Sequence, residues 1–247
     1  MGFYQKSKYS YQPGSSNPFK LSRSKIELFQ RCPKCFYLDR RFGIGQPPPA
    51  PYTLNSAVDT LLKKEFDAHR AAATRHPLME HYGIAAKPFD HPSINSWREN
   101  FEGVRTHHKP TNFIVFGAVD DIWQNENGDL HVVDYKATAK DSEITLDADW
   151  QISYKRQAEV YQWLLRQNDL TVSDTAYFVY VNGRKDRQAF DGKLEFDVHL
   201  LPYDGDASWI EPTLIKIKEA LDGNTFPESS PECEYCTYVS LREQALG

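Results

Sequence analysis

Hydrophobic positions divide the chain into stretches with helical spacing and stretches with strand-like spacing. Apolar side chains recur every three or four residues in 54–66 and in 152–165, which predicts two amphipathic helices. Runs rich in β-branched and aromatic residues, typical of strands, cover 112–123, 130–135, 175–181 and 193–200. The order of helix, two strands, helix, two strands predicts an α/β fold with a sheet backed by helices.

Turn and breaker residues set the expected ends of these elements. Asn127-Gly128 predicts a hairpin between the first two strands, and Asn182-Gly183 predicts a turn between the last two. Pro33 interrupts an N-terminal helical pattern, so we expect two helical pieces around it. A short helix is expected at 94–101 and a final helix at 209–221, followed by a looped tail.

Composition indicates a folded protein. The chain has 247 residues, of which 40% are hydrophobic and 26% are charged. No run approaches the roughly 18 consecutive apolar residues of a membrane helix, and the N-terminus lacks the apolar core of a secretory signal. We therefore expect a cytoplasmic protein without a membrane partner. Residues 1–19 predict a flexible basic arm and 20–247 a single domain.

Four cysteines form two pairs near opposite ends of the chain, Cys32-Pro-Lys-Cys35 and Cys233-Glu-Tyr-Cys236. Two residues between paired cysteines let both thiolates face one ion. In a reducing compartment this spacing favours metal ligands over disulfides. Four thiolates suit tetrahedral zinc or an iron–sulfur cluster, and the spacing does not choose between them.

The predicted hairpin carries acidic residues and a lysine. Asp120 follows Gly117 by three residues, and Asp134-Tyr-Lys136 lies on the second strand, where alternation places Asp134 and Lys136 on one face. Two carboxylates about 4 Å apart repel by about 4 kcal/mol at an effective dielectric near 20. A hard divalent cation such as Mg²⁺ or Mn²⁺ relieves that repulsion. The pattern predicts a metal site with a lysine beside it.

These residues carry a resemblance. Gly117-x-x-Asp120, Asp134-Tyr135-Lys136 and then Gln157-x-x-x-Tyr161 resemble, in this order, the PD-(D/E)XK nuclease superfamily. The resemblance is strongest to its RecB-like branch, which includes the CRISPR-associated adaptation exonucleases and the AddB-type iron–sulfur nucleases. The segment from Arg31 to Leu38 and the pair Cys233/Cys236 resemble that branch's cysteine motifs.

The resemblance implies a restriction-endonuclease-like fold, in which helices flank a central mixed sheet. Cysteines from 20–41 and 225–240 would join the N- and C-terminal segments in a cluster lobe. The roles it implies for individual residues are metal ligation by Asp120, Asp134 and the carbonyl of Tyr135, catalysis by Lys136, and contact with the site and the DNA by Gln157 and Tyr161.

Two positions depart from the family pattern. Asp59 stands where a metal-binding histidine is usual, and it is either an oxygen ligand or an exposed helix residue. The cysteines divide two and two between the ends of the chain, where the relatives supply one and three. The resemblance favours a [4Fe–4S] cluster on Cys32, Cys35, Cys233 and Cys236, with Zn²⁺ as the alternative.

The function expected from this sequence is a Mg²⁺- or Mn²⁺-dependent deoxyribonuclease. The expected substrate is DNA that is single-stranded or has free ends, in repair, recombination or CRISPR adaptation, with helicases or CRISPR-adaptation proteins as partners. One alternative is a catalytically inactive DNA-binding or scaffolding module that retains the nuclease fold. Another is a zinc-stapled protein-interaction module.

Overall fold

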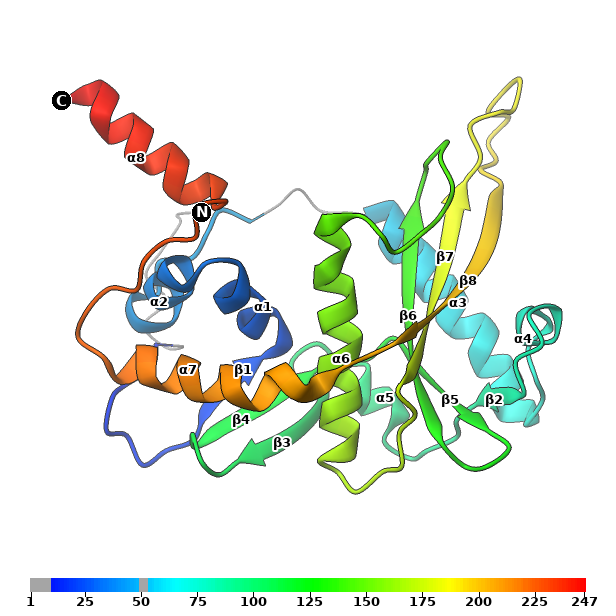
Figure 1. Ribbon diagram of the computed structural model, residues 1–247. Helices are drawn as coiled ribbons and strands as arrows, with labels where there is room; N and C mark the ends of the chain where they lie inside the picture. The colour runs from blue at the N-terminus through cyan, green and yellow to red at the C-terminus, as the bar shows by residue number, and fades with distance from the viewer. Residues whose placement is uncertain (1–9, 49–52) are drawn as a thin grey trace. The chain divides into compact units, whose positions relative to one another are not determined.

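The computed structural model describes residues 10–48 and 53–247 (Figure 1). The chain divides into two units. Unit 1 comprises Met1–Ala50, Thr106–Phe116 and Ser208–Gly247, and unit 2 comprises Pro51–Arg105 and Gly117–Ala207. The predicted arm falls partly on residues 1–9, outside the described residues. Tyr11, which belongs to the same segment, is buried and donates a hydrogen bond to Asp222.

Unit 1 combines a small sheet with helices. Strand β1 (Phe19–Ser22) pairs in parallel with β4 (Phe113–Gly117), and β3 (Val104–His108) follows β4 in the sheet order. The remaining helical elements of this unit are α1 (Arg23–Arg31), α2 (Pro33–Phe42), η3 (Ala207–Trp209, at the unit boundary), α7 (Ile210–Asp222) and α8 (Glu234–Leu246).

Local chemistry sets the bounds of the first two helices. The helical path breaks at Cys32, which has extended backbone angles, and α2 restarts with Pro33 at its first position. Proline is well tolerated there because the first N–H groups of a helix have no partner within the helix. Gly43 ends α2 in the left-handed region at φ 69°, where glycine has no side-chain penalty. The predicted interruption at Pro33 is confirmed.

Unit 2 is built on a five-stranded sheet. The order is β2-β5-β6-β7-β8, with β6 and β7 parallel and the other neighbours antiparallel. The strands are β2 (Ala86–Pro88), β5 (Asp121–Asn125), β6 (Leu130–Thr138), β7 (Thr175–Gly183) and β8 (Phe196–Asp204). The helical elements are α3 (Thr53–Ala72), α4 (Pro77–His81), α5 (Ile94–Trp97), η2 (Asp149–Gln151) and α6 (Ile152–Arg166).

Strand β6 occupies the middle of this sheet and is covered on both faces. Every residue from Leu130 to Tyr135 is buried, because α3 and α6 both contact the strand (Figure 1). Strands covered on both faces are near-continuously apolar, so a carboxylate within one stands out. On the α3 side, Phe66, Trp123, Tyr135 and Val179 belong to one aromatic-rich core cluster. The expected mixed sheet flanked by helices is confirmed.

Two local expectations were wrong, and a third was right only in part. The run 112–123 is not one strand: it breaks at 118–120, and its halves β4 and β5 belong to different sheets. The break follows Gly117, whose carbonyl oxygen lies so near Gly103 that a Cβ there would be 2.5 Å away. Asn182-Gly183 continues β7 and pairs with β8, so the turn comes later. The tail after α7 is a loop over 223–233, as expected, but it becomes helical at Glu234, so Cys236 lies on α8.

Within the described residues, no helix is both long and apolar enough to cross a membrane.

Candidate active site

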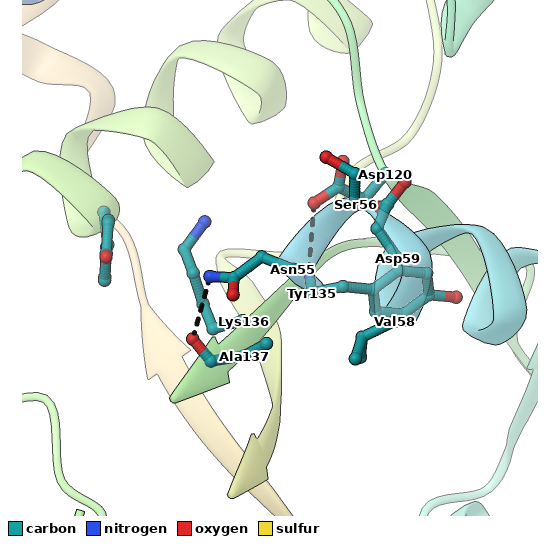
Figure 2. Close-up of a pocket in the computed structure, with 9 residues that line it drawn as sticks. Asn55, Ser56, Val58, Asp59, Asp120, Tyr135, Lys136 and Ala137 are labelled. Atoms are coloured by element: carbon teal, nitrogen blue, oxygen red, sulfur yellow. Dashed lines mark hydrogen bonds between the residues drawn. The ribbon is translucent and has the colours of Figure 1, made fainter. Parts of the chain in front are cut away.

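A polar pocket in unit 2 collects several residues predicted from the sequence (Figure 2). It encloses about 310 Å³. Helix α3, the segment before β5, strand β6 and helix α6 supply its lining: Asn55, Ser56, Val58, Asp59, Asp120, Tyr135, Lys136, Ala137 and Tyr154. Four of the seven residues assigned to the catalytic and Mg²⁺/Mn²⁺ site from the sequence therefore share one cavity.

Asp120 lies in the break between β4 and β5, not within a strand. The backbone N–H of Tyr135 donates to its carboxylate at 3.0 Å, a contact drawn in Figure 2. Its own carbonyl accepts from Nε of Arg98 at 3.0 Å. The break therefore frees Asp120 from the ladder and lets its side chain reach β6, while Arg98 holds the peptide that follows it.

Asp59 reaches the same pocket from α3. Lys63, one turn further along this helix, places its Nζ 2.9 Å from a carboxylate oxygen of Asp59 and 3.6 Å from one of Asp120. The Asp59 side chain is 34% exposed, as expected for a residue at a cavity wall. Lys63 thus supplies a positive charge between two carboxylates that would otherwise repel each other.

Lys136 lines the pocket and also contacts a row of polar side chains that do not line it. Its ammonium forms an ion pair with Asp134, whose side chain is 1% exposed and does not line the cavity. Burial by itself lowers the pKa of Lys136, but the carboxylates of Asp134 and Asp120 raise that pKa to a net value above its ordinary one. The lysine is therefore cationic at neutral pH.

Helix α6 extends this row of polar side chains. The Lys136 ammonium lies 3.5 Å from Oε1 of Gln157, and the Gln157 amide donates to the Tyr161 hydroxyl at 3.2 Å. Gln157 and Tyr161 are one helical turn apart and so share a face. The structure brings Asp134, Lys136, Gln157 and Tyr161 into contiguous contact.

A buried ion-pair network lies beside the pocket. Asp121 is fully buried and accepts from the guanidinium groups of Arg70 and Arg98 and, at 2.8 Å, from the Tyr135 hydroxyl. Burial and the Asp121 charge raise the pKa of Tyr135 well above its ordinary value, so this hydroxyl remains a donor. Arg98 also holds Asp67 of α3 at 2.9 Å. The network ties α3, β5 and β6 together around Asp120.

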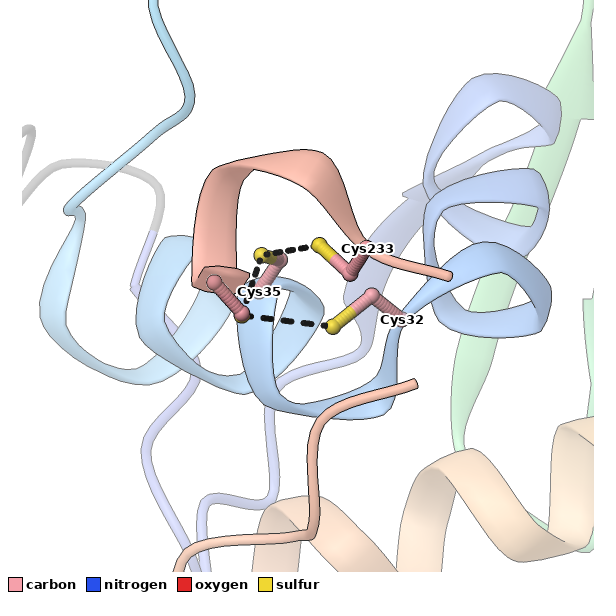
Figure 3. A group of neighbouring side chains, drawn as sticks. Cys32, Cys35 and Cys233 are labelled. Atoms are coloured by element: carbon pink, nitrogen blue, oxygen red, sulfur yellow. Dashed lines mark hydrogen bonds between the residues drawn. The ribbon is translucent and has the colours of Figure 1, made fainter. Parts of the chain in front are cut away.

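The four cysteines converge in unit 1 (Figure 3). Their Sγ atoms all lie within 4.8 Å of one another, with Cys35 at 3.6 Å from Cys233 and 3.5 Å from Cys236, and Cys32 at 3.8 Å from Cys236. Among the described residues, these four cysteines are the one group of three or more histidine, cysteine or acidic side chains whose ligand atoms lie close enough together to bind a single ion. The carboxylate oxygens of the pocket lie further apart.

The thiols differ in the direction in which their pKa values are shifted. Burial raises the pKa of Cys35 strongly and that of Cys236 to about 11. At Cys32 burial also acts to raise the pKa, but hydrogen bonds from the backbone of Cys35 and Ser230 outweigh it and lower the pKa to about 7. One thiolate is thus available near neutral pH, and a bound cation would favour ionisation of the others.

Several residues of these sites had no strong signal in the sequence. Lys63 could have been found from its spacing of four from Asp59 on a predicted helix. Tyr154 could have been found as an aromatic at the start of the helix that carries Gln157. Arg70 and Arg98 lie far from Asp121 along the chain, and no local pattern connects them.

The matches to known proteins cover most of the chain. The family model of the PD-(D/E)XK nuclease superfamily matches residues 20–241. One solved structure, described as the crystal structure of SSO0001, is 16% identical, with 93% of this chain and 87% of that chain covered and a TM-score of 0.38. No curated protein matches the chain.

Proposed function

Since the chain belongs to the PD-(D/E)XK nuclease superfamily, we propose that it hydrolyses phosphodiester bonds of DNA at the pocket around Lys136. The observation that carries this proposal is the meeting of Asp59, Asp120 and Lys136 at one cavity, although they come from separate elements. The proposed ion is Mg²⁺ or Mn²⁺, because the donors at the pocket are carboxylate and carbonyl oxygens.

Asp59, Asp120 and the carbonyl of Tyr135 would hold this ion, with Asp134 as the further ligand implied by the family resemblance. When bound, the ion would supply a Lewis acid that activates water and neutralises phosphate charge. Lys136, kept cationic by its acidic neighbours, would donate a hydrogen bond to a phosphate oxygen as negative charge develops there. Gln157 and Tyr161 would fix the position of that ammonium.

The branch we propose is the RecB-like one, and the action an exonuclease-like one on single-stranded or end-bearing DNA in repair, recombination or CRISPR adaptation. Two features support this branch. The motifs from Asp120 to Tyr161 occur in the order typical of it, and cysteines from both ends of the chain lie together. The proposed partners are helicases or CRISPR-adaptation proteins.

For the cysteine group we propose zinc in place of a [4Fe–4S] cluster. Four thiolates bound tetrahedrally to one zinc at about 2.3 Å lie roughly 3.8 Å from one another. Three of the Sγ–Sγ distances are 3.5, 3.6 and 3.8 Å, and all four Sγ atoms lie within 4.8 Å of one another. In a cubane each thiolate binds a separate iron, which requires the sulfurs to stand further apart. The spacing in unit 1 therefore fits a single ion better.

A second function is favoured by Lys63. Its ammonium lies between Asp59 and Asp120, where it neutralises the carboxylates that would otherwise attract a divalent ion. A protein that keeps this lysine in place during DNA binding would be a noncatalytic DNA-binding module.

A cleavage assay separates the two functions. End-labelled single- and double-stranded DNA is incubated with Mg²⁺, Mn²⁺ or EDTA and with wild-type protein, Lys136→Ala or Asp120→Asn. We expect metal-dependent cleavage that falls by about 100-fold or more in both variants, because Lys136→Ala removes the ammonium that would stabilise charge on the phosphate and Asp120→Asn weakens binding of the proposed ion. Lys64→Ala, an exposed lysine on α3, serves as the matched control and should cleave normally.

The product ladder distinguishes exonuclease from endonuclease action. DNA binding without cleavage under any metal condition would contradict the nuclease proposal and favour the binding module. In that case Lys63→Met should increase the affinity for Mn²⁺, because the competing ammonium is gone.

A further inference from the structure

Two aromatic side chains lie at the start of α6. Trp150, in the short helix η2, is 53% exposed, and Tyr154 follows one turn later. Their ring centroids are 5.3 Å apart and their planes meet at 84°, an edge-to-face contact. In this arrangement the Trp150 indole packs against the Tyr154 ring, and much of the indole stays exposed to solvent.

This aromatic pair is continuous with the pocket. Tyr154 lines the cavity, and the Lys136 ammonium lies 4.4 Å from the centroid of its ring. On the outer side, Nζ of Lys140 lies 5.1 Å from the centroid of the Trp150 ring. A path therefore runs from Lys136 across Tyr154 to an exposed indole, and all four residues belong to unit 2.

The charge of the neighbouring segment indicates which part of a nucleic acid would meet Trp150. Residues 139–149 contain a single basic residue, Lys140. The acidic residues in the same stretch are Asp141, Glu143, Asp147 and Asp149. Lys185 pairs with Asp141, but the segment keeps an excess of negative charge that disfavours a phosphate beside it, so the ligand group that suits the indole is the face of a base.

We propose that Trp150 is a stacking platform for an unpaired nucleobase close to the phosphate that occupies the pocket. The inference rests on the proposed function and deepens it, because it assigns to one residue the recognition of an unpaired base in single-stranded DNA or at the frayed end of a duplex. In an intact duplex, base faces are covered by their neighbours and cannot reach the indole. Phe36 and Tyr37, two aromatic residues beside the N-terminal cysteine pair, are buried and so present no ring face to a base.

The test measures binding without cleavage. A fluorescein-labelled oligothymidylate is titrated with protein in EDTA, using wild type, Trp150→Ala and Trp150→Phe. Loss of one base–aromatic stack weakens binding by roughly tenfold to hundredfold, so we expect that loss in Trp150→Ala and most of the affinity retained in Trp150→Phe. The slope of log affinity against log salt should stay the same, because no phosphate contact is removed.

An abasic scan gives the sharper readout. A single abasic site is moved along the oligonucleotide, and the position that stacks on Trp150 should weaken wild-type binding but not the binding of Trp150→Ala. Phe101→Ala is the matched control, because Phe101 is 84% exposed in the same unit and does not line the pocket. It should bind as wild type does.

Three results would overturn the inference: no binding by wild-type protein, unchanged affinity in Trp150→Ala, or an abasic profile that is the same in both proteins. A different result would refute the proposed nuclease function without refuting this inference. Absence of cleavage together with a Trp150-dependent abasic position would refute hydrolysis and leave the stacking platform standing.

Discussion

The pocket of unit 2 and the cysteine group of unit 1 differ in how their ligand atoms are held. Around the pocket, Asp59 and Asp120 share Lys63, and Asp134 is paired with Lys136. In the cysteine group, sulfur atoms pack against one another and against Leu28. The pocket already contains positive charges that balance its carboxylates. The cysteine group contains thiols, and a bound metal would favour their ionisation.

If the proposed ions bind, this difference predicts that the two sites depend on metal to different degrees. Carboxylates neutralised by lysine and arginine can be stable without an ion, so the ion of unit 2 would serve chemistry. Four thiols gathered from residues about 200 positions apart gain little from one another, so the ion of unit 1 would stabilise the fold. Of the three predictions below, the first two test this contrast and the third tests a buried ion pair of unit 1; they follow in order of decreasing effect.

The largest effect is expected from Arg98→Met. It leaves the fully buried Asp121, and Asp67 beside it, with one guanidinium partner each, that of Arg70, in place of two. Breaking a buried ion pair from one side costs about 3–5 kcal/mol, which urea denaturation would measure. Hydrogen exchange should increase in β5 and β6 and not in α1 and α2.

Arg105→Met is the matched control, because Arg105 is 40% exposed and pairs with the exposed Glu102. It should change the free energy of unfolding by less than about 0.5 kcal/mol. A loss below about 1 kcal/mol in Arg98→Met would mean that the pocket does not depend on this network.

A smaller effect is expected from removing the zinc ion that we propose for the cysteine group of unit 1. Wild-type protein purified without oxygen should contain one zinc per chain and show no iron–sulfur absorption. Cys35→Ser should lose the zinc and about 3 kcal/mol of stability, which corresponds to a melting temperature lower by roughly 6–12 °C.

Hydrogen exchange again locates the change. In Cys35→Ser it should increase in α1 and α2 and stay unchanged in β6 and β7. Iron with visible cluster absorption would refute the single-ion proposal. Equal changes in both units would refute the contrast between them.

The smallest effect concerns Asp39, a buried carboxylate of α2. Burial acts to raise its pKa, but the charges and hydrogen bonds of Arg40 and Lys25 outweigh burial and lower that pKa below its ordinary value. A carboxyl whose folded-state pKa is depressed adds stability that is present above its unfolded pKa, about 3.9, and is lost as pH falls through the folded value.

Asp39→Asn should therefore cost about 1–2 kcal/mol at pH 6, and the difference from wild type should shrink below about pH 4. Denaturation at a series of pH values measures both. Lys64→Ala, exposed in unit 2, is the control and should show no such trend. A difference that grows toward low pH would contradict the sign of this shift.

Local spacing accounted for much of the fold and of the candidate site. Helix α6 lies within one residue of the predicted 152–165, and the hairpin turn at Asn127-Gly128 joins β5 and β6. These succeeded because helical and strand periods are properties of a few neighbouring residues. The single strand expected over 112–123 was wrong because β4 pairs with β1 and β3 whereas β5 pairs with β2 and β6, and these partners come from distant segments of the chain.

The sequence by itself determined which residues share a face or a turn: Asp134 with Lys136, Gln157 with Tyr161, and each cysteine with its pair partner. Those relations follow from backbone periodicity alone. Only the tertiary structure decided that Lys63 stands between Asp59 and Asp120, that Arg98 holds both Asp121 and the backbone of Asp120, and that the two cysteine pairs meet. Contacts between distant segments depend on how whole elements pack, and no short stretch of sequence contains that information.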